Sequence, residues 1–182
     1  MDEREIILGC IAGRPKAQKA LFDIYAPKLL VICLRYMKEV PRAQDTLQDA
    51  FVKIYKHLPD YKFEGVFEGW VKRITVNTCL DQLRKDKKTL SDVSIDDVSF
   101  KLAHHDHSIE KLMADDLLKL VQSLPDGYRT VFNLFAIEGY SHQEIAKQLN
   151  ISESTSKTQY LRARAYLKDR LEKIDNDWTR QH

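Results

Sequence analysis

The chain has 182 residues, of which 43% are hydrophobic and 31% are charged, and its formal net charge is +2 at pH 7. That hydrophobic share can bury a core in one domain or in two small ones, and no apolar run is long enough to span a bilayer. Because Lys and Arg are nearly balanced by Asp and Glu, a uniformly basic nucleic-acid-binding chain is excluded, and any basic surface must be local.

The N-terminus and the cysteines both favour a cytoplasmic protein. The opening run MDEREIILGC is acidic, whereas a signal peptide begins with basic residues. The three cysteines, Cys10, Cys33 and Cys79, are odd in number, widely spaced and set in apolar stretches. We therefore expect reduced, buried thiols rather than a disulfide framework or a zinc site.

Before residue 88, apolar residues recur with helical rather than strand periodicity, which predicts an all-α fold. The first helix is expected over residues 2–12, with Gly13-Arg14-Pro15 as its breaker. Helical spacing resumes at Lys16, and we expect Pro27 to interrupt it. The apolar stripe over residues 29–37 is then predicted to be core.

The segment 42–58 is amphipathic in a more informative way. Its predicted core residues recur at three- and four-residue steps and are Leu47, Ala50, Phe51, Ile54 and Leu58. The opposite side carries Gln44, Asp45, Gln48 and Asp49. A solvated helix face is one interpretation; a docking surface for a basic protein partner is the other.

Residues 59–70, PDYKFEGVFEGW, form a loop rich in aromatic residues ahead of a further helix. One face of that helix is marked by Trp70, Val71, Ile74 and Thr78, and basic residues mark others. Aromatic rings beside cations suit single-stranded DNA, because bases stack on the rings while cations hold the phosphates. An aromatic helix start can equally be plain core.

Residues 86–108 lack sustained periodicity and are predicted to form a flexible linker. This linker contains His104, His105 and His107, whose spacing fits no single helical face. Three loop histidines are a weak metal signal, so we assign no metal.

After the linker, residues 109–124 are amphipathic, with Leu112, Leu117, Leu120, Val121 and Leu124 expected inward. Pro125-Asp126-Gly127 is expected to turn the chain. The helix 128–138 should bury Val131, Phe132, Leu134 and Phe135, and Gly139 should end it.

The stretch 141–164, SHQEIAKQLNISESTSKTQYLRAR, has the pattern of a helix-turn-helix. Ser141 and Glu144 form a capping box, Asn150 suits the left-handed turn that ends the first helix, and Ser152 caps the second. The second helix is basic and polar outside, which favours reading of duplex DNA. Thr155, Tyr160 and Ala163 are expected to face the domain. The alternative is an ordinary helical hairpin on a protein surface, with its basic residues merely solvated.

Two parts of the chain resemble a known family. The runs LFDIYAPKLL, RYMKEVPRAQDTLQDAFVKIYKHLPDYK and GVFEGWVKRITVNTCLDQLRK are similar to region two of bacterial RNA polymerase sigma factors of the extracytoplasmic-function class, in the sigma-70 family. The helix-turn-helix with its lead-in LPDGYRTVFNLFAIEGYS resembles region four of the same class. The two segments occur in the family's order and at its separation.

The resemblance implies a sigma factor that directs core RNA polymerase to promoters and assists promoter melting, without catalytic residues or cofactor. Implied partners are the clamp helices of the largest polymerase subunit, the flap of the second-largest, promoter DNA, and an anti-sigma factor, which in this family is commonly membrane-tethered. The implied domains are region two at 1–87, a linker at 88–108, region four at 109–175 and a tail at 176–182.

The resemblance also implies three sets of contact residues. Core polymerase would meet Gln44, Asp45, Gln48 and Asp49. The minus-ten element would meet Tyr61, Lys62, Phe63, Trp70, Arg73, Asn77 and Arg84. The minus-thirty-five element would meet Ser154, Lys157, Thr158, Gln159, Leu161 and Arg162. Ser156 departs from the family pattern, in which a small apolar residue is usual.

Two other functions are open to the residues. A stand-alone helix-turn-helix repressor or activator would bind duplex DNA without polymerase, but it needs neither the acidic face at 44–49 nor the aromatic loop at 61–70. A metal-dependent nuclease would have to use the three linker histidines. No phosphate loop, nucleophile triad or paired-carboxylate pattern is present in the sequence, so we expect a non-enzyme.

Overall fold

The structure is a computed structural model that describes residues 2–90 and 109–181, and side chains at 2–86 and 115–173. The chain divides into two compact units, residues 1–103 and 104–182. The first unit contains α1 (Glu3–Ile11), α2 (Pro15–Tyr36), α3 (Val40–His57), the 3-10 turn η1 (Leu58–Asp60) and α4 (Phe67–Leu90). The second contains α5 (Ile109–Gln122), α6 (Asp126–Phe132), the π-helical segment η2 (Asn133–Ile137), α7 (His142–Leu149) and α8 (Glu153–Gln181). Every described element is helical, as the all-α prediction requires.

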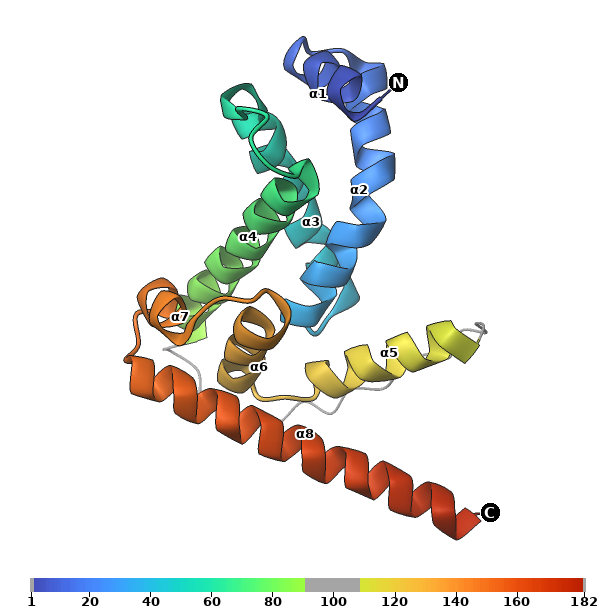
Figure 1. Cartoon of the computed structure of the whole chain (residues 1–182), viewed down its shortest axis with the longest axis vertical. Coiled ribbons are helices and arrows are strands. Elements are labelled where there is room, and N and C mark those ends of the chain that lie inside the picture. Colours follow the sequence, from blue (N-terminus) through green and yellow to red (C-terminus); the bar gives the residue numbers. More distant parts are fainter. Residues whose placement is uncertain (1, 91–108, 182) are drawn as a thin grey trace. The chain divides into compact units, whose positions relative to one another are not determined.

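In the first unit, α2, α3 and α4 pack against one another around a common core, and α1 packs against the start of α2 (Figure 1). The core side chains predicted on α3 are all buried: Leu47, Ala50, Phe51, Ile54 and Leu58. On α4, the structure also buries five residues that the predicted face omitted, namely Phe67, Thr75, Val76, Cys79 and Leu80. These apolar contacts between three long helices are the main source of stability in this unit.

The helix α1 is held in place by its cap and by a close approach to α2. The Asp2 side chain accepts from the backbone of Glu5, whose own carboxylate accepts from the Asp2 backbone, which completes a capping box. At Gly9, an added Cβ would lie 2.5 Å from Cβ of Ala17, so only glycine lets the two helices meet here.

The expected interruption at Pro27 is wrong, because α2 is one continuous helix from Pro15 to Tyr36. Pro27 lies on the exposed side, where its missing N–H leaves one carbonyl to water rather than to the core. The buried residues on both sides of it, among them Leu21, Leu29 and Ile32, keep the two halves of α2 on the same core.

The three cysteines are free and buried, as predicted. Burial raises the pKa of the Cys10 thiol, which keeps it protonated at neutral pH. Within the part of the chain that the structure describes, no helix is long and apolar enough to cross a membrane.

In the second unit, α6 and α7 pack against the first half of α8, and the rest of α8 continues beyond them (Figure 1). The chain turns at Pro125, α6 starts at Asp126, and the π-helical η2 follows before Gly139 ends the run with φ +79°. Val131 and Leu134 are fully buried, while Phe132 and Phe135 are half-buried.

The inward face predicted for residues 109–124, which contain α5, is partly wrong. Leu124 is fully buried, and Leu120 and Val121 are half-buried, but Leu117 is 60% exposed. The side chain of Leu112 lies outside the described residues. Residues 91–108 of the predicted linker, including His104, His105 and His107, also lie outside them. The prediction that the linker begins at residue 86 is wrong, because α4 continues to Leu90.

Candidate nucleic-acid and protein interfaces

The polar side of α3 is an exposed surface, which we call the acidic α3 face: Gln44, Asp45, Gln48 and Asp49. All four side chains point away from the core because the buried positions of α3 occupy the opposite side. Asp49 also accepts a hydrogen bond from the Gln82 amide of α4, whose Nε2 lies 2.6 Å from Asp49 Oδ2. The face therefore presents carboxylates to solvent from a rigid helix.

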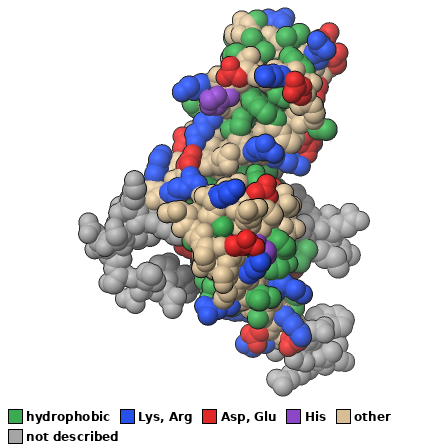
Figure 2. Space-filling view, turned by 60° about the vertical axis from the view of Figure 1, so that its left-hand side comes forward, with side chains coloured by type: hydrophobic (Ala, Val, Ile, Leu, Met, Phe, Trp, Pro, Cys, Tyr) green, Lys and Arg blue, Asp and Glu red, His purple; other side chains and the backbone are tan. Residues whose placement is uncertain are grey.

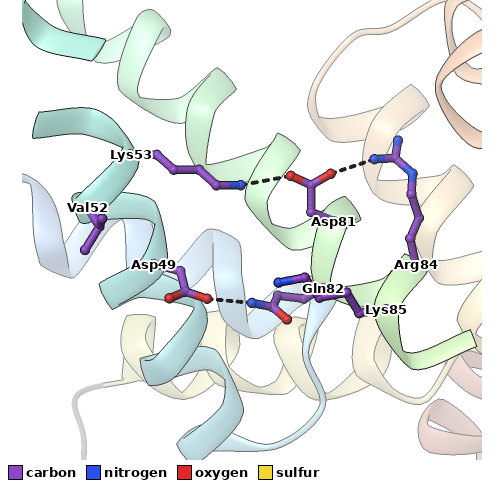
Figure 3. A pocket seen from close by; sticks show the side chains of 7 residues that line it. All are labelled: Asp49, Val52, Lys53, Asp81, Gln82, Arg84 and Lys85. Atoms are coloured by element: carbon purple, nitrogen blue, oxygen red, sulfur yellow. Dashed lines mark hydrogen bonds and ion pairs between the residues drawn. The ribbon is translucent and has the colours of Figure 1, made fainter. Parts of the chain in front are cut away.

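A pocket between α3 and α4 continues from this face (Figure 3). Its lining residues are Asp49, Val52, Lys53, Asp81, Gln82, Arg84 and Lys85. Asp81 on α4 is held between two cations, with Lys53 Nζ at 2.8 Å and Arg84 Nη1 at 2.7 Å. The hydrogen bond from Gln82 and the ion pair of Lys53 both link α3 to α4. Sequence reasoning missed this arrangement, because the partners lie about 30 residues apart.

The aromatic loop, residues 61–66, and the start of α4 form one cluster of rings. The ring of Tyr61 lies 5.1 Å from Phe63, 5.1 Å from Phe67 and 5.2 Å from Trp70, measured between ring centres. Tyr61 and Phe67 are buried, Trp70 is half-buried, and Phe63 is 37% exposed. Tyr61 is therefore placed to support the cluster from within, while Phe63 and Trp70 are the rings that a base could reach.

The first turn of α4 is tied to α2 by a carboxylate between two lysines. Glu68 pairs with Lys28 of α2 at 2.6 Å and with Lys72 at 2.7 Å. The hydrogen bonds from Lys28 and Lys72 lower the pKa of Glu68 to about 2. Both lysines are therefore partly neutralised.

The other predicted minus-ten residues follow one side of α4. Trp70, Arg73, Asn77 and Arg84 are separated by three, four and seven residues, which returns each to nearly the same side of the helix. Arg73 and Asn77 are exposed close to the aromatic cluster. Arg84 lies about 21 Å farther along the axis than Trp70 and pairs with Asp81 in the α3–α4 pocket. The structure thus groups the loop residues with Trp70, Arg73 and Asn77, and sets Arg84 apart.

In the second unit, the structure confirms the predicted helix-turn-helix at each of its three signals. Ser141 and Glu144 form both halves of a capping box on α7. Asn150 adopts the left-handed conformation with φ 53°. The backbone N–H of Thr155 donates to Ser152 Oγ at 3.0 Å, which caps α8.

The outward side of α8 is the candidate reading face. Its exposed residues are Ser154, Lys157, Thr158, Leu161 and Arg162. Glu153 pairs with Lys157 at 2.7 Å, and that hydrogen bond lowers the Glu153 pKa. Arg162 Nη1 reaches the Tyr128 hydroxyl on α6 at 3.4 Å, so its guanidinium is exposed yet oriented. Gln159 is half-buried at the edge of this face, because its side chain lies against Gly127 of α6. A Cβ added at Gly127 would be 3.4 Å from the Gln159 amide nitrogen.

The inward side of α8 explains the unusual serine. Ser156 is fully buried, and its Oγ lies 2.9 Å from His142 Nδ1 on α7. The His142 ring stacks on Phe135 at 4.1 Å between ring centres. Ala163 is fully buried and Tyr160 packs on Phe135, as predicted, whereas the expectation that Thr155 faces the domain is wrong. Thr155 is exposed because it belongs to the cap, and Ser156 takes the inward position.

Charges of both signs are mixed on the face of the molecule that Figure 2 shows, with Lys and Arg beside Asp and Glu. Binding of nucleic acid would therefore depend on small local surfaces rather than on one broad basic field. Among the described residues, His, Cys, Asp and Glu form no cluster of three or more that could hold a metal ion.

Comparison with known proteins places both units in one family. Residues 21–89 match the family described as Sigma-70 region 2, and residues 114–167 match the family described as Sigma-70, region 4. The helix-turn-helix and the acidic α3 face thus lie within matched stretches, whereas α1 lies before the first of them.

Several relatives are similar over most of their length. The RNA polymerase sigma factor SigZ of Bacillus subtilis is 34% identical over 84% of this chain and 85% of its own. The RNA polymerase sigma-H factor of Pseudomonas aeruginosa is 30% identical over 82% of this chain and 85% of its own. The extracytoplasmic-function (ECF) RNA polymerase sigma factor SigW of Bacillus subtilis is 29% identical over 87% of this chain and 91% of its own.

Two solved structures share the fold. CnrH, solved in complex with the cytosolic domain of CnrY, matches with a TM-score of 0.51 at 23% identity. The match covers 97% of that chain and 93% of this one. The sigma factor RpoE of Bartonella quintana, solved with the anti-sigma factor NepR, has a TM-score of 0.55 at 22% identity, covering 96% of that chain and 85% of this one. With both region families matched and relatives of at least 30% identity, the chain belongs to the sigma-70 family of RNA polymerase sigma factors, in its extracytoplasmic-function class.

Proposed function

We propose that this chain directs core RNA polymerase to promoters by dividing the work between its two units. Residues 1–87 bind core polymerase and capture the minus-ten element, and residues 109–175 read the minus-thirty-five element, with 88–108 as the linker and 176–182 as a tail. The observation that carries the proposal is the pairing of a capped helix-turn-helix with an exposed acidic helix face in a chain of this family. A sigma factor is not an enzyme, and this function needs no cofactor.

Reading of the minus-thirty-five element would fall to the exposed side of α8. Arg162 can pair bidentately with a guanine, and its contact with Tyr128 orients the guanidinium before DNA binds. To contact DNA, the Lys157 ammonium group would have to leave Glu153 or bind Glu153 and a phosphate at the same time. Ser154, Thr158 and Leu161 are exposed beside them, and Gln159 acts from the flank.

Capture of the minus-ten element would begin at the aromatic loop. Phe63 and Trp70 offer ring faces to unpaired bases, and Lys62, Arg73 and Asn77 lie exposed nearby. Tyr61 would support these rings rather than stack on a base itself. Unstacking a base costs a few kcal/mol, which pocket contacts and polymerase would offset without any chemical step. Arg84 lies far enough along α4 to contact a phosphate at the other end of the strand.

The acidic α3 face, Gln44, Asp45, Gln48 and Asp49, would dock on the clamp helices of the largest polymerase subunit. An exposed carboxylate pair on a rigid helix suits a basic partner, because complementary charge speeds and orients association. The second unit would dock on the flap of the second-largest subunit. An anti-sigma factor would compete for these surfaces, a partner supported by the similarity to RpoE, which was solved with one.

Run-off transcription from a library of randomised promoters tests this function. Purified chain is added to templates with and without bacterial core polymerase. Initiation that requires both proteins, from templates that share two spaced elements, is the expected result. Binding to a single duplex site without polymerase, and no initiation, would instead identify a stand-alone repressor or activator.

A further inference from the structure

The helix α1 lies before the stretch that matches Sigma-70 region 2, yet it contacts the segment that leads into the aromatic loop. It packs against η1, the turn directly before residues 61–66. From α1, Arg4 reaches over the ring of Phe63, with its guanidinium carbon 5.1 Å from the ring centre. A residue outside the matched stretch therefore covers the exposed ring of the loop.

Phe63 itself is held in an unusual backbone conformation. Its φ of 57° lies in the left-handed region, which bulky side chains avoid. Gly65, two residues later, also has a positive φ, so the loop is sharply bent. Within this bend Phe63 is 37% exposed, although an aromatic side chain gains by burial. Strained backbone conformations of this kind cluster at functional sites.

The backbone of Arg4 is fixed, whereas its side chain is exposed. The close approach of Gly9 to Ala17 sets α1 against α2, and the Tyr25 hydroxyl donates to Glu3 Oε2 at 2.5 Å. These contacts hold α1 on both sides of Arg4 along the chain. The long exposed side chain of Arg4 can then change rotamer without moving the helix.

We propose that Arg4 and Phe63 form the two walls of a site for one unpaired base, with the base between the guanidinium and the ring. This inference rests on the proposed minus-ten role of the aromatic loop. Two stacked contacts of about 3.5 Å each require about 7 Å between the walls. Arg4 must therefore lift by roughly 2 Å from its present position over Phe63, which a rotamer change can supply.

The charges around Arg4 favour a base over a phosphate as its ligand. Asp2, Glu3 and Glu5 surround it in sequence on the first turn of α1, and their carboxylates repel a phosphate. A base is uncharged, and the planar guanidinium of arginine stacks on aromatic faces. Lys62 on the loop and Arg73 on α4 are exposed cations that could take the phosphates on either side.

The test measures equilibrium binding of holoenzyme, assembled from the full chain and core polymerase, to a labelled single strand that carries the selected minus-ten element. Each position of the strand is also made abasic in turn, which removes the base and keeps the phosphate. The variants are Phe63→Ala, Arg4→Ala and Arg4→Lys. The matched control is Lys16→Ala, an exposed cation at the start of α2.

We expect Phe63→Ala to weaken binding by about five-fold to about 100-fold, and one abasic position to have a similar effect. Arg4→Ala should weaken binding to the intact strand by about two- to five-fold and have no effect on the strand that is abasic at that position. Arg4→Lys should not restore binding, because an ammonium group does not stack as a plane. Lys16→Ala should bind as the unchanged chain does.

Two results would overturn the role of Arg4 alone. If Arg4→Ala weakened binding to the abasic strand as much as to the intact strand, Arg4 would hold a phosphate. If Phe63→Ala weakened binding and Arg4→Ala did not, the base site would have only one wall. A separate result, in which neither Phe63→Ala nor any abasic position mattered, would remove the proposed minus-ten role of the loop and the inference with it.

Discussion

The two units of this protein achieve a fixed shape by different means. In the first, side chains from three long helices form a broad apolar core, and ion pairs such as Lys53–Asp81 and Lys28–Glu68 link neighbouring helices at the surface. In the second, α6 and α7 are short and the described apolar core is small, centred on Val131, Leu134 and Ile145. Polar groups are buried beside it, notably Arg129 and Ser156.

This difference suits the two proposed tasks. Apolar contacts are non-directional, so a large core gives a stable platform on which docking and base-stacking surfaces can be placed. Hydrogen bonds are directional, and a buried polar group tolerates few arrangements because leaving it unpaired is costly. In the second unit, a bond of this kind joins Ser156 of α8 to His142 of α7, which would help to fix the angle of the proposed reading helix.

The largest expected effect is on the surface of the first unit. Asp49→Arg places a cation on the acidic α3 face, where a basic partner is proposed, and like charges across an interface cost several kcal/mol. We expect binding to core polymerase to weaken by about 100-fold or more, with the helical content unchanged. Affinity measured by titration of labelled core polymerase checks this.

A matched control is Asp23→Arg, a charge reversal on α2 at an exposed carboxylate that pairs with Lys19 in the preceding turn. It should leave core affinity within about two-fold, because exposed pairs contribute little. Equal loss in the two variants would show that core polymerase responds to net charge and not to the acidic α3 face.

The next largest effect concerns the buried arginine of the second unit. Arg129 is 2% exposed, and it donates from Nη1 to the Leu124 carbonyl at 2.9 Å and pairs through Nη2 with Asp126 at 2.9 Å. Burial lowers its pKa, although the guanidinium remains charged at neutral pH. Arg129→Ala would leave the carbonyl unpaired and open a cavity, so we expect the second unit to lose about 2–4 kcal/mol.

Hydrogen exchange of the full-length chain, followed by mass spectrometry, separates the two units. Arg129→Ala should speed exchange in α6–α8 and leave α2–α4 unchanged. Arg129→Met restores most of the buried volume but not the hydrogen bond, so its cost should be smaller. If Arg129→Met were as destabilising as Arg129→Ala, the hydrogen bond rather than packing would dominate.

A smaller, position-specific effect is expected on the reading face. Arg162→Ala should cost about 1–3 kcal/mol at a single base of the minus-thirty-five element and relax selection at that position. Competition binding of holoenzyme to promoters that differ at one base measures it. A loss spread evenly over all sequences would make Arg162 a phosphate contact instead.

Ser156→Ala tests the link between a buried polar contact and reading. The change removes the hydrogen bond to His142 and should destabilise the second unit by about 1 kcal/mol. If this bond sets the rotation of α8, discrimination among minus-thirty-five sequences should fall more than affinity for unrelated duplex. His142→Phe keeps the stacking on Phe135 and loses the bond, so the two variants should behave alike.

Much of the fold could be predicted from local patterns. The Ser141–Glu144 capping box, the Asn150 turn and the apolar spacing of α3 depend on residues within a few positions of one another, and the structure confirms them. Pro27 failed as a breaker because burial on both sides of it outweighs one lost hydrogen bond. The prediction that Leu117 faces inward failed because amphipathic spacing does not reveal how much of a helix is covered by its neighbours.

The site was less predictable where it depends on contacts between distant segments. The residues of the acidic α3 face and the reading face follow from helical periodicity. The pairs Arg4–Phe63, Asp49–Gln82 and His142–Ser156 do not, since each joins elements whose approach is set by the core. Ser156 did carry a signal, because a polar residue at a usually apolar position requires a buried partner.

The smallest expected effect tests the surface ion pairs of the first unit through pH. Lys28 and Lys72 lower the pKa of Glu68 from its ordinary value of 4.5 to about 2, so the folded state favours the charged carboxylate. The resulting stability is fully present above about pH 4.5 and is lost as pH falls toward about 2. Glu68→Gln should therefore lower the Tm by a constant small amount at neutral pH, and the difference from the unchanged chain should shrink between pH 4.5 and 2. Thermal unfolding across this range measures it, with Glu64→Gln on the exposed loop as the control. A difference that stayed constant down to pH 2 would mean that Glu68 stabilises α4 by packing and not by charge.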